Sequence, residues 1–383
     1  MEYRELGSTG LKVSEIGFGA EWMDKPDAEV VTFVDKCQKS GINIMDVWMS
    51  DPEMRRKLGS AMAALGSRDS WIIQGHIGST WQGGQYVRTR DIEKCRAAFE
   101  DLLELLQTDY VELGMIHYVD GISEFADIMA GGPYLDYVHE LHEAGTIQHI
   151  GLSTHNPDVA LKALDYPEIE VVMFSINPAF DMMPPTENLD DLFGDFSGAN
   201  DDGIDPKRAQ FYRMAEDRSV GVTVMKPYAG GRLLDAEKSP FGVAMTPTQC
   251  IEYCLTRPAV ASVLAGYSEL AHIDEALAYE SASAKEKDYA SVLANAPTHA
   301  YYGNCIYCGH CQPCTVGINI AEVNKLADLA LMQDEVPASV REHYLALDAT
   351  ASDCIACGAC EPNCPFGVHI VARMAETAEL FGE

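Results

Sequence analysis

The sequence predicts an α/β fold, a closed (β/α)8 TIM barrel followed by a smaller, helix-containing domain at the C-terminal end. Over roughly the first 280 residues, short apolar runs alternate with amphipathic stretches. This alternation is typical of a parallel sheet covered by helices. Beyond that region two dense runs of cysteine replace the alternation. We therefore predict two domains, 1–282 and 283–383.

Eight apolar runs supply the expected strands, and this number favours a closed barrel over an open sheet. Amphipathic, helix-like stretches follow most of them, and the units recur about every 30 residues, as the βα repeat of such a barrel requires. The runs are 14–20, 42–48, 71–78, 111–118, 147–155, 170–177, 221–228 and 260–267.

Two connections differ from the other loops. The stretch 181–206 is long, acidic and rich in Gly, Asp and Pro. We expect a lid or a partner-docking loop there, with an ordinary surface loop as the alternative. The segment 78–90 is rich in glycine and contains Trp81 and Tyr86. We expect it to form a mobile flap that covers a ligand.

Eight of the twelve cysteines form the two runs near the C-terminus. Three thiolates at three-residue steps can wrap one face of an iron–sulfur cube, and in two-cluster proteins the fourth ligand comes from the other run. We therefore predict two [4Fe–4S] clusters that move single electrons. One set of ligands is Cys305, Cys308, Cys311 and Cys364, and the other is Cys354, Cys357, Cys360 and Cys314. Zinc sites space their cysteines differently, and disulfide frameworks suit small secreted domains.

Composition restricts the partners and the compartment. A net charge of −32 argues against nucleic acid as a partner. The charge would attract a basic face on an electron-transfer partner, although solubility explains it equally well. No apolar run is long enough to span a membrane, and the N-terminus lacks a signal-peptide pattern. Because cluster ligands must be reduced thiols, we expect a cytoplasmic protein of an anaerobic or microaerobic cell.

The chain resembles two known families, one over each part. YRELGSTGLKVSEIGFGA, GINIMDVW, GMIHYVD, GTIQHIGLS and VMKPYAGG occur in the order in which the aldo/keto reductases have such motifs. The tail resembles bacterial two-cluster ferredoxins. The whole chain is similar to ferredoxin-fused aldo/keto reductase-like proteins, which implies a barrel oxidoreductase with an iron–sulfur domain.

The resemblance also implies positions for a catalytic tetrad of Asp, Tyr, Lys and His. The aspartate matches Asp46 and the histidine matches His117. The tyrosine position holds Asp51 and the lysine position holds His76. Because the tyrosine donates the proton in that family, its loss disfavours the usual NADPH-dependent reduction of a carbonyl.

The positions that hold the family's nicotinamide cofactor are altered as well. Met173 stands where the family has a glutamine, and the segment around Gly266 offers no Arg or Lys for a phosphate. A 2′-phosphate without a cation partner would bind poorly. NAD(P)H and a flavin are both possible cofactors, but no residue indicates either.

Strand alternation brings Asp46, Gln74, His76 and His117 together at the C-terminal mouth of the barrel. A carboxylate stabilises a neighbouring imidazolium, so we expect Asp46 to keep His76 protonated as general acid. We expect His117 to orient a substrate oxygen. Candidates for substrate binding are Trp48, Gln74, Trp81, Tyr86, His155 and Tyr228.

Two other uses of these side chains remain open. The imidazoles of His76, His117 and His155 could hold a metal ion, and the aromatic side chains could simply pack in the core. The cysteines outside the two runs are expected to be buried thiols. They are Cys37, Cys95, Cys250 and Cys254.

The favoured hypothesis is an iron–sulfur oxidoreductase. An external carrier of the ferredoxin or flavodoxin type would pass electrons through the clusters to a small organic substrate in the barrel mouth. The first alternative is an NAD(P)H-dependent carbonyl oxidoreductase coupled to the clusters. The second is a non-catalytic electron-transfer subunit with a degenerate barrel. We expect no contact with nucleic acid or membrane, and a homo-oligomer stays open.

Overall fold

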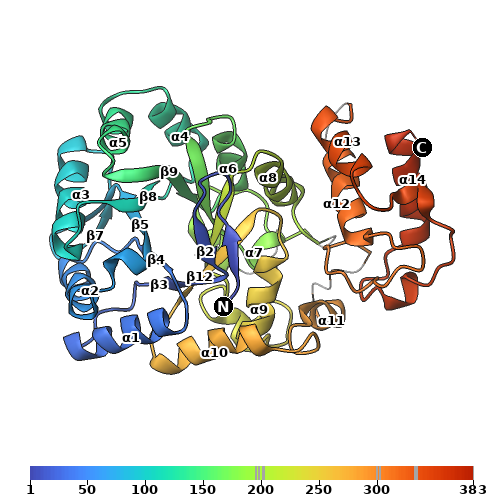
Figure 1. Ribbon diagram of the computed structural model, residues 1–383, viewed down its shortest axis with the longest axis horizontal. Coiled ribbons are helices and arrows are strands. Elements are labelled where there is room, and N and C mark those ends of the chain that lie inside the picture. Colours follow the sequence, from blue (N-terminus) through green and yellow to red (C-terminus); the bar gives the residue numbers. More distant parts are fainter. Residues whose placement is uncertain are drawn as a thin grey trace.

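The computed structural model describes residues 1–194, 196, 199–200, 203–298, 301, 303–331 and 335–382. Within these residues eight parallel strands close into one barrel, in the order β10-β11-β12-β3-β4-β5-β8-β9. In Figure 1 the barrel and its helices, coloured from blue to light orange, lie on the left, and the dark orange and red C-terminal helices form a smaller body on the right. The predicted fold class is confirmed.

Each predicted apolar run contains one barrel strand. The strands are β3 (Ile16–Gly19), β4 (Ile44–Val47), β5 (Ile72–Ile77), β8 (Val111–Ile116), β9 (Ile147–Thr154), β10 (Ile169–Ser175), β11 (Gly221–Met225) and β12 (Val260–Gly266). The register aligns Asp46 with Gln74 and His76 with Met115 on neighbouring strands. Polar residues near the ends of β4 and β5 therefore meet at one level of the barrel.

Helices on the outside cover the strands, which explains why the strands are apolar along nearly their whole length. They are α1 (Asp27–Lys39), α2 (Pro52–Leu65), α3 (Ile92–Leu106), α4 (Ile122–Met129), α5 (Pro133–Glu143), α6 (Pro157–Ala163), α7 (Pro178–Asp181), α8 (Pro206–Asp217), α9 (Pro247–Leu255) and α10 (Leu270–Ser281). The isolated cysteines Cys37, Cys95, Cys250 and Cys254 are buried among them, as expected.

A hairpin that the sequence did not predict covers the N-terminal end of the barrel. It is formed by β1 (Tyr3–Glu5) and β2 (Lys12–Ser14). Leu6 and Val13 belong to the same apolar cluster as Ile44, Leu113 and Met173 inside the barrel. Side chains therefore fill the barrel interior at this end, and barrel enzymes place their chemistry at the opposite, C-terminal mouth.

The glycine-rich segment after β5 is a regular β-hairpin. It consists of β6 (Ser79–Gln82) and β7 (Gln85–Arg88), joined at Gly83 and Gly84. Both glycines have positive φ, 61° and 80°, as a two-residue hairpin turn of this type requires. The movement of this hairpin as a flap stays a prediction.

The long acidic connection after β10 is only partly described, because residues 195, 197, 198, 201 and 202 lie outside the described residues. Its described part contains the short 3-10 helix η2 (Leu189–Phe193). The carbonyl of Phe193 accepts a hydrogen bond from Arg232 at 2.7 Å. Its proposed role as a lid or docking loop stays a prediction.

The C-terminal body packs against one side of the barrel. Its elements are α11 (Tyr289–Ala294), α12 (Ile320–Leu331), α13 (Ala338–Leu345), η4 (Ala351–Asp353), η5 (Glu361–Asn363) and α14 (Ile370–Phe381). On α12, Asp328 pairs with Arg213 of α8 at 3.0 Å, and Lys325 pairs with Glu216. Of the described helices, none is long and apolar enough to cross a membrane. The boundary at residues 282 and 283 stays a prediction.

Candidate active site and cluster cavities

Each predicted set of four cysteines surrounds its own cavity. Cys305, Cys308, Cys311 and Cys364 line one, and Cys314, Cys354, Cys357 and Cys360 line the other. Among the described residues, no three Cys, His, Asp or Glu side chains converge as a site for a single metal ion. The thiols thus surround a space rather than a point, which fits a cube of iron and sulfur.

The two cysteine runs share one backbone pattern. Tyr307 and Ala356, each directly before the second cysteine of its run, have left-handed φ values of 57° and 52°. Gly309 and Gly358 follow with φ values of 76° and 70°. Such turns direct successive N–H groups toward an enclosed anion. The internal repeat of the sequence is therefore also a repeat of local structure.

Side chains also donate hydrogen bonds to the sulfurs. The Asn324 amide donates to Cys305 Sγ at 3.3 Å, and the Thr315 hydroxyl lies 3.3 Å from Cys357 Sγ. Hydrogen bonds to cluster sulfurs are one of the factors that set reduction potential. The two cavities therefore differ in their hydrogen-bonding partners as well as in exposure, since Cys357 is exposed and Cys311 is buried.

Four polar side chains at the barrel mouth form one continuous hydrogen-bonded chain, which we call the relay. Asp46 Oδ1 lies 2.8 Å from His76 Nε2, and His76 Nδ1 lies 2.8 Å from His117 Nδ1. His117 Nε2 lies 2.7 Å from the hydroxyl of Tyr86. Asp46 comes from β4, His76 from β5, His117 from the end of β8 and Tyr86 from β7.

The hydrogen atoms of the relay can be placed in one way when both imidazoles are neutral. A carboxylate only accepts, so His76 Nε2 donates to Asp46 and His76 Nδ1 accepts from His117 Nδ1. His117 Nε2 then accepts from the phenol of Tyr86. Burial holds the pKa of His117 well below its usual 6.5, so this ring is neutral.

Trp48 and Gln74 support the relay from the sides. The Trp48 ring is stacked with the His117 ring at 6.2 Å between centroids, and it meets Tyr86 edge-on at 5.4 Å. The Gln74 amide donates to Asp46 Oδ1 at 3.0 Å and lies 3.6 Å from Met173 Sδ. Gln74 therefore orients the carboxylate, and Trp48 forms a wall beside the phenol.

Asp51, which occupies the tetrad's tyrosine position, has a structural role. Its carboxylate caps α2 by accepting from the N–H groups of Glu53 and Met54 at 2.8 and 3.3 Å. The phenol of the mouth comes instead from Tyr86 on the hairpin after β5. Sequence reasoning placed Tyr86 near a ligand but did not predict its bond to His117, because no local pattern aligns a hairpin residue with a strand end.

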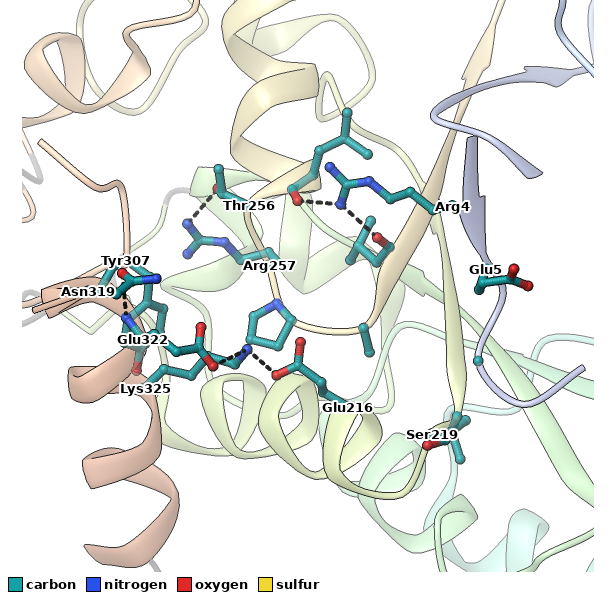
Figure 2. Close-up of a pocket in the computed structure, with 17 residues that line it drawn as sticks. Arg4, Glu5, Glu216, Ser219, Thr256, Arg257, Tyr307, Asn319, Glu322 and Lys325 are labelled. Atoms are coloured by element: carbon teal, nitrogen blue, oxygen red, sulfur yellow. Dashed lines mark hydrogen bonds and ion pairs between the residues drawn. The ribbon is translucent and has the colours of Figure 1, made fainter. Parts of the chain in front are cut away.

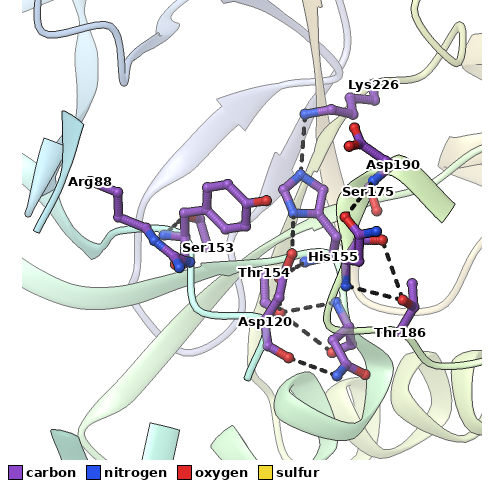
Figure 3. Close-up of polar contacts among 12 residues, drawn as sticks. Arg88, Asp120, Ser153, Thr154, His155, Ser175, Thr186, Asp190 and Lys226 are labelled. Carbon is purple, nitrogen blue, oxygen red and sulfur yellow. Dashed lines mark hydrogen bonds and ion pairs between the residues drawn. The ribbon is translucent and has the colours of Figure 1, made fainter. Parts of the chain in front are cut away.

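A second polar group lies in the same mouth and was only partly predicted. His155 Nδ1 lies 2.9 Å from Asp120 Oδ2, and His155 Nε2 lies 3.1 Å from Lys226 Nζ (Figure 3). Burial, followed by the charge of Lys226, lowers the pKa of His155 to about 4. Burial also lowers the pKa of Lys226. Asp120 and Lys226 both come soon after the end of a barrel strand. This position is the sequence signal that could have identified them as residues of the mouth.

Left-handed backbone marks this part of the mouth as well. Tyr118, which follows His117 after the end of β8, has a φ value of 46°, and Lys226, directly after β11, has a φ value of 56°. Non-glycine residues in this region are strained, and such strain concentrates at functional sites. The Tyr118 ring meets the His155 ring edge-on at 5.0 Å, and Arg88 lies 4.6 Å over the Tyr118 ring.

The remaining predicted residues separate into two places. Tyr228 lines a mouth cavity of about 330 Å³ together with Lys226. Trp81 does not join them: it lines a pocket with Arg55 and Lys94 outside the mouth. The three imidazoles do not converge as a metal site among the described residues, since His155 is bonded to Asp120 and Lys226.

The residues that line the mouth cavity can be compared with what a nicotinamide dinucleotide needs for binding. Its described lining contains the carboxylates of Glu21 and Glu275 and only one Lys or Arg, Lys226. A Cβ at Gly266 would lie 2.4 Å from Glu21 Oε1, so this carboxylate covers the expected phosphate-binding segment. Two carboxylates beside one shared cation do not fit the phosphates of such a cofactor.

A further cavity, of about 460 Å³, lies between the N-terminal end of the barrel and α12 (Figure 2). Two of the cations that line it, Arg4 and Lys325, are engaged by neighbouring groups. Arg4 donates to the carbonyls of Leu255 and Val260 at 2.8 and 3.1 Å, and Lys325 pairs with Glu322 at 3.4 Å. This cavity is at the opposite end of the barrel from the relay.

Fold and site together define a barrel oxidoreductase joined to an iron–sulfur domain. The profile of the Aldo/keto reductase family matches residues 15–247, and that of the 4Fe-4S dicluster domain matches residues 301–368. The chain belongs to the aldo/keto reductase family, and its C-terminal domain is a ferredoxin-like 4Fe–4S domain.

Individual relatives are distant. Aldo-keto reductase YhdN of Bacillus subtilis is 24% identical over 193 residues, 48% of this chain and 54% of YhdN. The chain thus spans about half the length of that relative. The uncharacterized oxidoreductase YqkF of the same organism is 24% identical over 72% of this chain and 90% of YqkF. The holo structure of aldo-keto reductase AKR11C1 from Bacillus halodurans superposes with a TM-score of 0.58 at 22% identity, covering 75% and 94% of the two chains, and shows the shared fold.

Proposed function

We propose that this protein is an iron–sulfur oxidoreductase that reduces a small organic substrate in the barrel mouth. Two [4Fe–4S] clusters, one in each cysteine cavity, would supply electrons one at a time. The observation that carries the proposal is the relay, because it ends in a phenol at the mouth and begins in a buried carboxylate. The proposed reaction takes place in the cytoplasm, where ligand thiols stay reduced.

The relay has a second arrangement that holds one more proton. If His76 is protonated beside the Asp46 carboxylate, its Nδ1–H donates to His117 Nδ1, and His117 Nε2–H donates to the Tyr86 oxygen. The Tyr86 hydroxyl is then free to donate to a substrate oxygen. Delivery of that proton, followed by shifts along both imidazoles, returns the relay to its neutral arrangement.

These two arrangements assign a role to each residue. Tyr86 is the catalytic acid that touches the substrate, His117 conducts the proton, and His76 with Asp46 stores it. The sequence hypothesis of His76 as the proton source is kept, but both nitrogens of His76 are engaged and the donor to the substrate becomes Tyr86. His117 is likewise engaged at both nitrogens, so it conducts a proton rather than orienting the substrate.

The two alternatives have less support. The acidic lining of the mouth cavity disfavours NAD(P)H as the hydride donor. A non-catalytic barrel gives no reason for four buried or half-buried polar groups in one unbranched chain, since buried polar groups are costly to retain. An external one-electron carrier, of the ferredoxin or flavodoxin type, is the proposed donor.

The test is substrate conversion without nicotinamide. Purified holoprotein is incubated anaerobically with reduced methyl viologen and a panel of small ketones, enones and aromatic ketones, and products are separated by chromatography. We expect conversion of at least one compound class by the wild-type protein and none by Cys308→Ser, which breaks one cluster site. Conversion by Cys308→Ser at the wild-type rate would contradict the proposal.

A further inference from the structure

A connected set of buried side chains links the cavity of Cys305 with the barrel mouth; we call it the bridge. It consists of Arg257, Tyr253, Asp181, Arg208 and His155. Their exposed fractions are 2%, 0%, 0%, 0% and 4%. Charged side chains are seldom buried to this extent without a specific purpose. The bridge lies outside the relay, so the proposed proton transfer does not account for it.

Arg257 forms the end of the bridge near the cysteines. Its Nη2 donates to the carbonyl of Ile306 at 2.9 Å and to the Tyr289 hydroxyl at 3.1 Å. Ile306 lies within the Cys305–Cys308 loop, and Arg257 is near enough to Cys308 to act on it electrostatically. Within the described part of the chain, Nε and Nη1 of Arg257 have no hydrogen-bond partner.

Among the described residues, no carboxylate lies within ion-pair distance of Arg257, although the guanidinium plane lies 4.3 Å over the Tyr253 ring. A buried charge without a partner costs several kcal/mol. Asp181 acts on Arg257 electrostatically without direct contact. An anionic iron–sulfur cluster in the neighbouring cavity would add a second negative charge on the other side of the guanidinium.

From Arg257 the bridge continues to the mouth. The Tyr253 hydroxyl donates to Asp181 Oδ2 at 2.7 Å, and Asp181 Oδ1 lies 3.6 Å from Arg208 Nη1. Arg208 Nη2 donates to the carbonyl of His155 at 3.2 Å. The side chain of His155 contacts Lys226, which lines the mouth cavity.

The packed bridge contrasts with the space beside it. The cavity of Figure 2 separates the N-terminal end of the barrel from α12. Electron tunnelling decays more slowly through covalent bonds, hydrogen bonds and aromatic rings than across gaps. The bridge therefore offers a continuous connection where the neighbouring interface is open.

We propose that the bridge is the electron route between the cluster held by Cys305, Cys308, Cys311 and Cys364 and the barrel mouth, and that Arg257 raises the reduction potential of that cluster. This inference rests on the proposed function. In each transfer one electron leaves the reduced cluster and reduces an acceptor in the mouth, and no bond of the bridge changes. A two-electron reduction requires two such transfers and two protons.

The first test measures potential rather than turnover. Arg257→Met and Arg257→Lys holoproteins are titrated anaerobically, and both clusters are followed by electron paramagnetic resonance. We expect Arg257→Met to disfavour reduction of one cluster about tenfold, a fall of about 59 mV for one electron. Arg257→Lys, which keeps the charge, should stay near the wild-type potential, and the other cluster should not change.

Arg55→Met is the matched control. Arg55 is also 2% exposed and also has an unpartnered Nη2 among the described residues, but it binds the carbonyls of Met49 and Ala98 on the other side of the barrel. An unchanged potential in Arg257→Met, or an equal shift in Arg55→Met, would overturn the assignment of Arg257. If Arg257→Met does not fold, Arg257→Gln, which also removes the charge but keeps hydrogen-bonding groups, is titrated in its place with the same expected fall in potential.

The second test measures the route without any substrate. A ruthenium photosensitiser is attached to Trp22→Cys, because Trp22 is 50% exposed and lines the mouth cavity. A laser flash with a sacrificial donor delivers single electrons, and bleaching of the cluster absorption is timed. Tyr253→Leu should slow the bleaching severalfold, whereas Tyr110→Leu, remote from the bridge, should leave it unchanged.

Equal bleaching rates in Tyr253→Leu and the wild-type protein would overturn the route. Because no substrate is present, that result would leave the proposed reduction reaction standing. Conversely, a failed substrate screen with normal bleaching would count against the proposed function and leave the route intact.

Discussion

The cysteine domain and the barrel mouth both gather polar side chains around a space, but they are built differently. Each cysteine run is local: three cysteines of each predicted ligand set lie within a few residues, in a loop with the same left-handed turns in both repeats. The relay takes each residue from a different strand. A site that lies within one loop is encoded by spacing, whereas a site assembled across strands depends on register.

The largest effect is expected when one cysteine of a predicted ligand set is removed. Cys308→Ser should lose about half of the protein's iron, because four of the irons depend on that set. Reduced methyl viologen should no longer drive substrate conversion, while far-ultraviolet circular dichroism of the barrel stays unchanged. Iron analysis and the conversion assay measure both. Full iron content in this variant would contradict the ligand assignment.

At the mouth, the corresponding change is Tyr86→Phe. This variant loses only the hydroxyl that contacts His117 Nε2 at 2.7 Å. Because general acid catalysis contributes typically 10²–10⁴-fold, we expect kcat to fall by about that factor with KM little changed. The control is Tyr110→Phe, whose ring lies 4.4 Å from the Arg68 guanidinium, away from the mouth. Equal kcat in both variants would exclude Tyr86 as the acid.

The sequence predicted which cysteines line each cavity and where the barrel strands lie, because both depend on short patterns. It also predicted that Asp46, Gln74, His76 and His117 meet, since strand ends of a barrel share one mouth. It did not predict the link through Tyr86, because the position of a hairpin over the mouth depends on tertiary packing. Trp81 is the direct cross-strand partner of Tyr86 in this hairpin, yet it lines another pocket, which again depends on how the hairpin packs.

Stability should depend on pH through the second polar group of the mouth. The pKa of His155 is about 4 in the folded protein against 6.5 for the ordinary side chain. As pH falls, His155 is therefore protonated in the unfolded chain before it is protonated in the folded protein. The stability that comes from burying neutral His155 is complete above about pH 6.5 and is lost progressively as pH falls toward about 4. Between these two pH values the free energy of unfolding should fall by about 1.4 kcal/mol for each pH unit.

Urea denaturation at several pH values between 5 and 7 measures this slope. His155→Gln should have a smaller slope than the wild-type protein, even if its stability at pH 7 is lower. His149→Gln is the control, because His149 pairs with Glu170 on a partly exposed part of β9. If His155→Gln and the wild-type protein had the same slope, the buried neutral state of His155 would be refuted.

The smallest expected effect is that of Asp51, which has a structural role, in contrast to the residues proposed to be catalytic. Asp51→Ala removes the N-terminal cap of α2 and should lower the free energy of unfolding by about 1 kcal/mol. Conversion of substrate should not change.

Asp51→Tyr restores the residue type of the tetrad but should give no NADPH-dependent activity, since the cofactor positions are acidic. Substantial activity in Asp51→Tyr would show that one substitution alone had disabled the barrel.

The central claim is that electrons reach the barrel singly from the clusters rather than as hydride from a nicotinamide. The most direct measurement is an anaerobic titration of the holoprotein with NADPH, then NADH, then dithionite, following the broad visible absorption of the clusters. We predict that both nicotinamides leave the absorption unchanged and that dithionite bleaches it. Bleaching by stoichiometric NADPH or NADH would contradict the claim and place hydride transfer in the barrel.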